Sequence, residues 1–265
     1  MSKKGEYIGF PEGRLREKPV RLSVLGNEED WFAVNKFAGI LPQAHPWYPD
    51  RPNLTSVIRE QVAEGKGELQ RLGISQSHYI SGAECEFAGP TLFAKSKAAA
   101  DFLKNAFGSN QFLFRFWFLT AKKTELPEQE CTLPVGPHKS EPRLVVTHRY
   151  GKKATTRFTR LIQRDNLSLW EATTTHPRLH QIRLHAAELE LGILGDSLYG
   201  VPEVADFARK DQKRNRLFNH RFSGLAAVLR CLDLSAVIGK EWVLEAPLPK
   251  PFLSLLRKCG IEGVE

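Results

Sequence analysis

The chain has 265 residues, of which 42% are hydrophobic and 26% charged, as in an ordinary globular protein with one large or two small domains. No apolar run approaches the roughly 20 residues that a membrane span needs, and the N-terminus lacks the apolar core of a secretory signal, so we expect a cytoplasmic protein without a membrane partner. The net charge of +8 favours a polyanionic partner, although a merely basic surface explains it about as well.

The four cysteines are far apart in the chain and form no Cys-x-x-Cys pair; they are Cys85, Cys131, Cys231 and Cys259. This spacing argues against a zinc site or a disulfide framework. We therefore expect free thiols and no metal.

Hydrophobic periodicity and turn residues predict a single mixed α/β domain, because no internal repeat or break in composition divides the chain. The predicted elements, in chain order, are a loose basic arm over residues 1–20, a strand at 31–35, helices at 53–63 and 96–107, a strand at 112–120, a long loop or short ribbon at 121–143, strands at 154–163 and 167–173, a helix from 177 to 192, and strands at 226–234 and 241–245. Ser96 is the expected helix cap, and phenylalanines occupy every second position from Phe112 to Phe118 on one strand face.

The densest group of polar residues lies in the helix predicted to begin near Pro177. There, Arg178, Gln181 and His185 would share one side, and His180 and Arg183 another. A solvated helix face is the simplest interpretation, and contact with an anionic ligand is the alternative. The basic interval from 209 to 221 has the same two interpretations, a solvated face or an RNA-contacting loop.

Residues 178–185, Arg-Leu-His-Gln-Ile-Arg-Leu-His, and residues 193–200, Ile-Leu-Gly-Asp-Ser-Leu-Tyr-Gly, resemble the signature of RluA-type RNA pseudouridine synthases. Further segments at 34–39, 91–96, 151–155 and 246–249 resemble other parts of that family in the same order. The resemblance implies the pseudouridine synthase fold over residues 21–258, an α+β domain with a mixed, mainly antiparallel, bent sheet flanked by helices around a central cleft. Residues 259–265 would form a tail, and no S4 domain is expected before residue 20.

The resemblance also implies a reaction. Enzymes of that family detach a uracil base from its ribose, rotate it and rejoin it through carbon, without a cofactor. The chemistry needs an aspartate, a tyrosine and an arginine. Here Glu84 stands at the aspartate and Phe116 at the tyrosine, while Arg183 is retained. Gly82 and Pro177 also replace an arginine and a glycine of the family pattern.

The resemblance makes Glu84 and Arg183 the candidate catalytic residues, paired with each other. Glu86 is a second candidate carboxylate, and Glu84 could instead be an ordinary surface acid. The candidate substrate-binding residues are Phe116, Arg178, His180, Gln181, Asn35 and Lys36. Phe116 could equally pack in the core, with Trp117 presented after a one-residue slip, and a strand-end turn explains Asn35 and Lys36 as well. Gly195, Asp196, Tyr199 and Gly200 are expected to shape a turn.

Two functions follow from these residues. The first is an isomerase that forms pseudouridine in structured RNA, either rRNA or tRNA. The second is an inactive relative that binds structured RNA without modifying it. The sequence does not indicate an oligomeric state, and a monomer is the simplest expectation.

Overall fold

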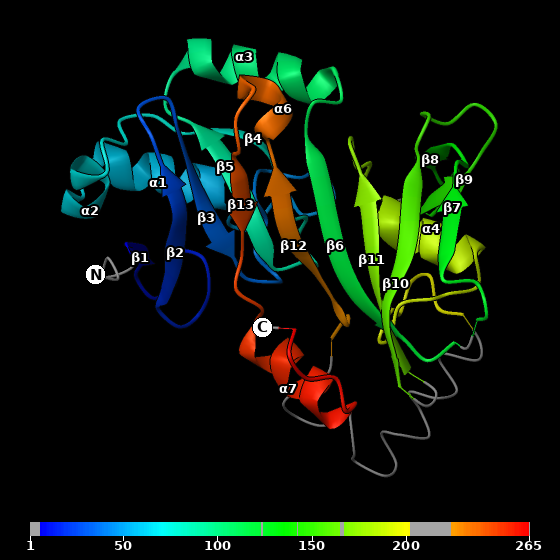
Figure 1. Ribbon diagram of the computed structural model, residues 1–265. Coiled ribbons are helices and arrows are strands. Elements are labelled where there is room, and N and C mark those ends of the chain that lie inside the picture. The colour runs from blue at the N-terminus through cyan, green and yellow to red at the C-terminus, as the bar shows by residue number, and fades with distance from the viewer. Residues whose placement is uncertain (1–5, 123, 142, 165–166, 202–223, 265) are drawn as a thin grey trace. The chain divides into compact units, whose positions relative to one another are not determined.

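The computed structural model describes residues 6–122, 124–141, 143–164, 167–201 and 224–264 (Figure 1). The helices of this part of the chain are α1 (Leu54–Ala63), α2 (Gly67–Arg71), α3 (Lys97–Gly108), α4 (Gln181–Glu188), α6 (Ser235–Ile238) and α7 (Lys250–Lys258). Its strands are β1 (Tyr7–Phe10), β2 (Val20–Asn27), β3 (Trp31–Lys36), β4 (His78–Gly82), β5 (Gly89–Ala94), β6 (Leu113–Thr120), β7 (Glu128–Cys131), β8 (Val135–Pro137), β9 (Val145–Thr147), β10 (Thr156–Arg164), β11 (Leu167–Thr174), β12 (Ala227–Asp233) and β13 (Val243–Glu245).

The chain forms two compact units. Unit 1 comprises Met1–Phe112 and Cys231–Ala246, and unit 2 comprises Leu113–Arg230 and Pro247–Glu265. The named strand pairs within both units are antiparallel, which confirms the expected α+β class with mainly antiparallel sheets. The single domain over residues 21–258 stays a prediction.

Unit 1 is built on a sheet with the strand order β1-β2-β3-β5-β4. Its core joins apolar side chains of β1, β2 and β3 to those of α1 and α2. The predicted cap of α3 is present, since the Ser96 side chain accepts the Ala99 N–H at 3.1 Å, and the Asn53 side chain caps α1 in the same way by accepting the Ser56 N–H at 3.0 Å. The last three residues of β12 pair with β13 in this unit.

The N-terminal segment differs from the loose arm expected over residues 1–20. β1 pairs with β2 from Tyr7 opposite Ser23 to Phe10 opposite Val20. Alternation along β1 turns Ile8 and Phe10 into the core of unit 1, and this burial outweighs the polar and basic composition that suggested a loosely ordered arm. Residues 1–5 lie outside the described part of the chain.

The sheet of unit 2 has the order β12-β6-β11-β10-β7, with the first four residues of β12 in this unit. Strand β6 shows the predicted alternation, because Phe114, Phe116 and Phe118 are buried while Arg115 and Trp117 are partly exposed. β10 and β11 lie within two residues of their predicted bounds, and their turn at 165–166 is outside the described residues. β8 and β9 form a separate two-stranded ribbon, so the segment 121–143 contains short strands.

The helix predicted from Pro177 to Gly192 is shorter in the structure. α4 begins at Gln181, because His180 adopts a left-handed conformation with φ of +55° that a helix cannot include. Arg178 and His180 therefore precede the helix, and the predicted sharing of helix faces with Gln181, Arg183 and His185 is wrong. The predicted interval 209–221 lies outside the described residues. None of the helices within the described ranges is long and apolar enough to cross a membrane.

Replacing Phe10 by Ala should lower the free energy of unfolding by about 3–5 kcal/mol, because its ring is only 2% exposed and its loss leaves a cavity. Tyr7→Ala is the matched control on the same strand, where the ring is 51% exposed, and should change stability by about 0.5 kcal/mol. Urea unfolding of the two variants measures both values. Equal effects would mean that β1 does not contribute to the core.

Candidate functional site

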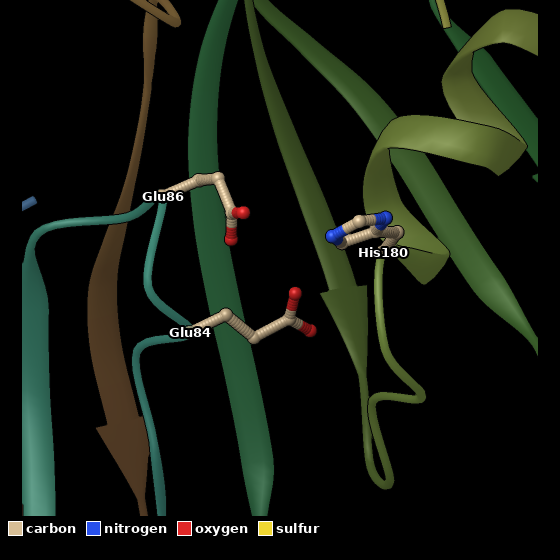
Figure 2. Close-up of side chains that lie close together, drawn as sticks. All are labelled: Glu84, Glu86 and His180. Atoms are coloured by element: carbon tan, nitrogen blue, oxygen red, sulfur yellow. The ribbon is translucent and has the colours of Figure 1, made fainter. Parts of the chain in front are cut away.

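The two candidate carboxylates lie in the loop that joins β4 to β5. Figure 2 shows Glu84 and Glu86 on this loop, with both side chains directed away from it. Both residues are half-buried. The base of the loop is closed by strand pairing of Gly82 with Thr91 and by a 2.9 Å hydrogen bond from the Ala83 N–H to the Pro90 carbonyl. We call residues 83–88 the carboxylate loop.

Gly82 has a backbone that no other residue adopts without strain, with φ of +144°. A Cβ atom at this position would lie 2.4 Å from the Pro90 carbonyl oxygen and 2.6 Å from the Thr91 Cα. The arginine that the family pattern places here is therefore incompatible with this backbone. Gly89, at the other end of the loop, also has a positive φ, of +141°.

Lys36, at the end of β3, holds the carboxylate loop from within. Its ammonium group donates to the carbonyl oxygens of Glu84 at 2.8 Å, Phe87 at 2.8 Å and Phe37 at 3.1 Å. The side chain is completely buried, and burial lowers the pKa of Lys36 from 10.5 to about 7. These contacts agree with the strand-end turn that the sequence left open for Lys36, and its role in substrate binding stays a prediction.

A second backbone contact joins the segment 34–39 to the carboxylate loop. The Gly39 N–H donates to the Cys85 carbonyl at 2.6 Å, and Gly39 has a φ of +85°. The Arg51 guanidinium donates to the Gly39 carbonyl at 2.8 Å. Asn35 pairs with Pro90 across the sheet and is half-buried. The segment 34–39 therefore holds the backbone of residues 84–87 of the carboxylate loop through these hydrogen bonds.

Tyr79, on β4, lies within the electrostatic reach of Glu84. Burial, and to a lesser extent the Glu84 carboxylate, raise the pKa of the Tyr79 hydroxyl above its usual value. The hydroxyl therefore stays protonated in the neutral pH range, and the negative charge in this unit is carried by carboxylates.

Arg183, on α4, forms a bidentate ion pair with Asp196. Its Nε donates to Oδ2 at 2.7 Å and its Nη2 to Oδ1 at 2.6 Å. The side chains are 4% and 0% exposed, respectively. Oδ1 also accepts the N–H groups of Leu198 at 2.8 Å and Tyr199 at 3.0 Å. Asp196 thus shapes the turn, as expected, and in addition fixes the orientation of the arginine, which the sequence analysis missed.

His180 is buried and held by Tyr199. The Tyr199 hydroxyl accepts the Val145 N–H at 2.9 Å and lies 3.0 Å from Nδ1 of His180, so we assign its own proton to that bond. The Arg183 guanidinium lies over the Tyr199 ring, 5.2 Å from its centre. A left-handed backbone at a non-glycine residue persists only where its surroundings enforce it, and this contact supplies that constraint. Figure 2 shows the His180 ring at the start of α4.

Gln181 and His185 anchor α4 to the sheet of unit 2. The Gln181 amide donates to the side-chain oxygens of Thr156 at 2.9 Å and Thr174 at 3.2 Å. Nε2 of His185 donates to the Leu133 carbonyl at 2.9 Å, so Nδ1 accepts the Thr156 hydroxyl at 2.9 Å. Burial lowers the pKa of His185, which favours this neutral form. Both side chains are fully buried.

Arg178 and Phe116, two further predicted substrate-binding residues, occupy different environments. The Arg178 side chain is half-buried, and its backbone N–H donates to the Gln181 side-chain oxygen at 2.9 Å. Phe116 is buried on the apolar face of β6, where its ring stacks with Phe114 at 6.4 Å. Trp117 lies on the opposite face and donates to Glu171 at 3.1 Å. Core packing of Phe116, the alternative left open by the sequence, agrees with this position.

Each unit thus brings together a part of the predicted site. Unit 1 holds Glu84, Glu86 and Lys36, and unit 2 holds Arg183, His180 and their partners. Because Glu84 and Arg183 belong to different units, their predicted pairing stays a prediction. The absence of a metal and a cofactor from the reaction also stays a prediction.

Comparison with known proteins identifies relatives that are named as pseudouridine synthases. Ribosomal large subunit pseudouridine synthase C of Rickettsia conorii is 31% identical over 252 residues, which are 93% of this chain and 75% of the relative. tRNA pseudouridine synthase C of Vibrio parahaemolyticus is 26% identical over 267 residues, covering 91% and 96%. No protein-family model matches the sequence.

The fold resembles a solved human structure, RNA pseudouridylate synthase domain containing 4. The TM-score is 0.69 at 19% identity, and the match covers 91% of this chain and 94% of that one. The architecture expected from the sequence motifs is thereby confirmed.

Replacing Asp196 by Asn should lower the free energy of unfolding by about 3–5 kcal/mol, because it leaves the buried Arg183 cation without its counter-charge. Glu130→Gln is the matched control: it removes the carboxylate that pairs with Arg157 at an exposed site and should cost less than about 1 kcal/mol. Chemical unfolding gives both values. A loss as small as that of the control would contradict a structural ion pair.

The stability of the protein should depend on the pH through Lys36. The pKa of Lys36 is lowered in the folded state, so between about pH 7 and 10.5 the unfolded chain binds a proton that the folded chain does not. The free energy of unfolding of the protein, relative to Lys36→Met, should therefore rise with pH across this window and stay level below it.

Urea unfolding at several pH values measures this difference. Lys104→Met, which alters an exposed lysine of α3, provides the control for losing a lysine. A difference between the protein and Lys36→Met that is constant from pH 6 to 10 would exclude a charge-burial effect at Lys36.

Proposed function

Since the chain belongs to the RluA-type RNA pseudouridine synthases, we propose that it isomerises uridine to pseudouridine in structured RNA, with Glu84 as the catalytic carboxylate and Arg183 as the catalytic cation. The observation that supports the proposal is the carboxylate loop, whose backbone is held by hydrogen bonds from Lys36 to the carbonyls of Glu84 and Phe87 and from Gly39 to that of Cys85; we propose that Glu84 takes the place of the family's aspartate on this loop. Fixed geometry of this kind is what a reaction between oriented groups requires.

The replacement of aspartate by glutamate changes the reach of the carboxylate by one methylene group, on the order of 1.5 Å, and a displacement near 1 Å can reduce a rate about 10²-fold. The backbone of Glu84 is held by the Lys36 ammonium and by the turn to Phe87, so the loop can present the longer side chain in a fixed direction. We infer that the loop conformation compensates for the longer side chain.

The remaining candidate residues receive different roles in this proposal. We assign Lys36, Gln181 and His180 to positioning, because they are buried and bound to other parts of the protein. Arg178, half-buried next to His180, is proposed to contact an RNA phosphate, and Asn35 is proposed to lie beside the bound nucleotide. Phe116 is proposed to contribute its ring as apolar packing behind the base.

The proposed reaction conserves the composition of the nucleotide, since one glycosidic bond is exchanged for another within the same residue. It therefore consumes no co-reactant. The side chains proposed for it are a carboxylate and a guanidinium, which need no metal or organic cofactor to carry their charges.

Structured RNA is the proposed partner. The relatives' names specify tRNA and large-subunit ribosomal RNA, and the net charge of +8 supports binding of a polyanion. We propose the cytoplasm as the location, which agrees with four free cysteines at Cys85, Cys131, Cys231 and Cys259.

A second function is favoured by one specific observation. Glutamate and phenylalanine stand where the family pattern has aspartate and tyrosine, and Gly82 excludes the arginine of that pattern. An inactive relative that binds structured RNA without modifying it would tolerate all three changes. Both functions imply RNA affinity that falls as the salt concentration rises, so activity has to be measured directly.

Glu84→Gln should lower the rate of pseudouridine formation by at least about 10²-fold while leaving RNA binding nearly unchanged, because it removes the charge and keeps the shape. The substrate is total RNA from cells that lack the gene, and pseudouridines are mapped before and after incubation with the protein. Glu86→Gln, on the same loop, is the matched control and should keep the activity.

Three outcomes separate the possibilities. New pseudouridine with the unaltered protein, lost in Glu84→Gln alone, supports the proposal. Loss in Glu86→Gln alone would transfer the catalytic role to Glu86. Binding without any new pseudouridine, followed by activity only in the double variant Glu84→Asp and Phe116→Tyr, would establish the inactive relative.

A further inference from the structure

An exposed turn follows β9 and returns to pair with Val135 of β8, and although its end overlaps the family-like segment 151–155, the proposed reaction gives its side chains no role. We call His148–Lys153 the ribbon tip. Within residues 138–153 the sequence has five Lys and Arg residues and a single acidic residue, Glu141. In the structure Arg149, Lys152 and Lys153 are exposed.

The ribbon tip is held by its own backbone. The Gly151 N–H donates to the His148 carbonyl at 2.7 Å, and Val135 and Lys152 exchange two hydrogen bonds of 2.9 Å. A Cβ at Gly151 would lie 2.7 Å from the Val135 carbonyl carbon, so the close approach of the two segments requires glycine. The exposed side chains are therefore mounted on a defined turn.

Tyr150 is the most exposed of the large hydrophobic side chains in the described part of the chain, at 77%. The Arg149 guanidinium lies 4.6 Å from the centre of its ring, and the His148 ring lies 5.5 Å away. An exposed aromatic ring beside a guanidinium, on a turn with two exposed lysines, is an arrangement that can stack an unpaired base while neutralising its phosphate.

Hydrogen bonds and apolar contacts join the ribbon to α4, the helix that carries Arg183, and to Tyr199. The Val145 N–H donates to the Tyr199 hydroxyl, and the Thr147 hydroxyl donates to Glu188 of α4 at 3.1 Å. Val145 also shares an apolar cluster with Leu184. Figure 1 shows β8 and β9 next to α4. A ligand bound at the ribbon tip would thus contact the same rigid assembly that positions the arginine.

We propose that the ribbon tip binds an unpaired nucleotide near the target uridine, with its base stacked on Tyr150 and the adjacent phosphates neutralised by Arg149, Lys152 and Lys153. This inference rests on the proposed function and names a part of the RNA that it recognises. An acidic protein segment would satisfy the cations but would leave the exposed aromatic ring without a stacking partner, so RNA fits the surface better.

The test compares variants in binding of a labelled single-stranded uridine-containing oligonucleotide and in pseudouridine formation. Tyr150→Ala should weaken binding about 5- to 150-fold, the loss expected for one stacked base, and Tyr150→Phe should retain it. The matched control is Phe102→Ala, which removes an exposed ring from α3 in unit 1 and should have no effect on binding.

The cations are tested through the salt dependence. The double variant Lys152→Gln and Lys153→Gln should reduce the slope of log affinity against log salt by about 1.4, the value for two single-strand phosphates. Lys97→Gln with Lys104→Gln removes the same charge from the exposed surface of α3 and should leave the slope unchanged.

The outcomes distinguish this inference from the proposed function. Equal binding by Tyr150→Ala and Phe102→Ala, while the protein still binds RNA and forms pseudouridine, would overturn the inference alone. Displacement of the oligonucleotide by polyglutamate as effectively as by unlabelled RNA would also overturn it, because stacking would then contribute nothing. Failure of the unaltered protein to bind any RNA would remove the proposed function together with the inference.

Discussion

The buried ion pair of Arg183 and Asp196 is the interaction on which the surrounding structure of unit 2 depends. Two charges removed from water are stable only if their geometry is nearly ideal and their other hydrogen-bonding positions are filled. Asp196 meets this condition with two backbone N–H groups, and the Arg183 guanidinium gains a cation-π contact with the Tyr199 ring. The requirement fixes the helix, the turn and, through the Tyr199 hydroxyl, the ribbon relative to one another within the unit.

Lys36 imposes a comparable constraint in unit 1 by different means. Its partners are backbone carbonyls, and these belong to the loop between β4 and β5 as well as to the residue that follows β3. A buried lysine nitrogen with three acceptors stabilises one backbone conformation, since a displaced carbonyl would lose its hydrogen-bond partner in a poorly solvated part of the protein. Side chains on a loop held in this way gain the definition that loops ordinarily lack.

Local patterns predicted the elements whose side chains alternate or recur at helical spacing. The phenylalanines of β6 and the cap Ser96 are examples, because their burial or hydrogen bonding is decided by neighbours in the sequence. β1 was missed because its burial depends on pairing with β2. The start of α4 was misplaced because the conformation of His180 depends on Tyr199, 19 residues further on.

The same distinction applies to the candidate site. The motif identified Arg183, Glu84 and the family, but it could not show that Lys36 and Gln181 would be consumed by internal hydrogen bonds. Asp196 was assigned to a turn, although its place in the phrase Ile-Leu-Gly-Asp next to an arginine-bearing helix could have suggested an ion pair. Residue types indicate which groups are present, whereas partners separated along the chain decide which of them stay available.

The sequence differs from the pattern that it resembles at Gly82 and Glu84 in unit 1 and at Phe116 in unit 2. A tyrosine at position 116 would add a hydroxyl that needs a hydrogen-bond partner on a buried face. An aspartate at position 84 would bring the carboxylate about 1.5 Å closer to the backbone of the loop. An arginine at position 82 is excluded outright, because its Cβ would collide with the Pro90 carbonyl. In this chain Gly82, the backbone of Glu84 and the Lys36 contacts form one arrangement, which a side chain at position 82 would disrupt.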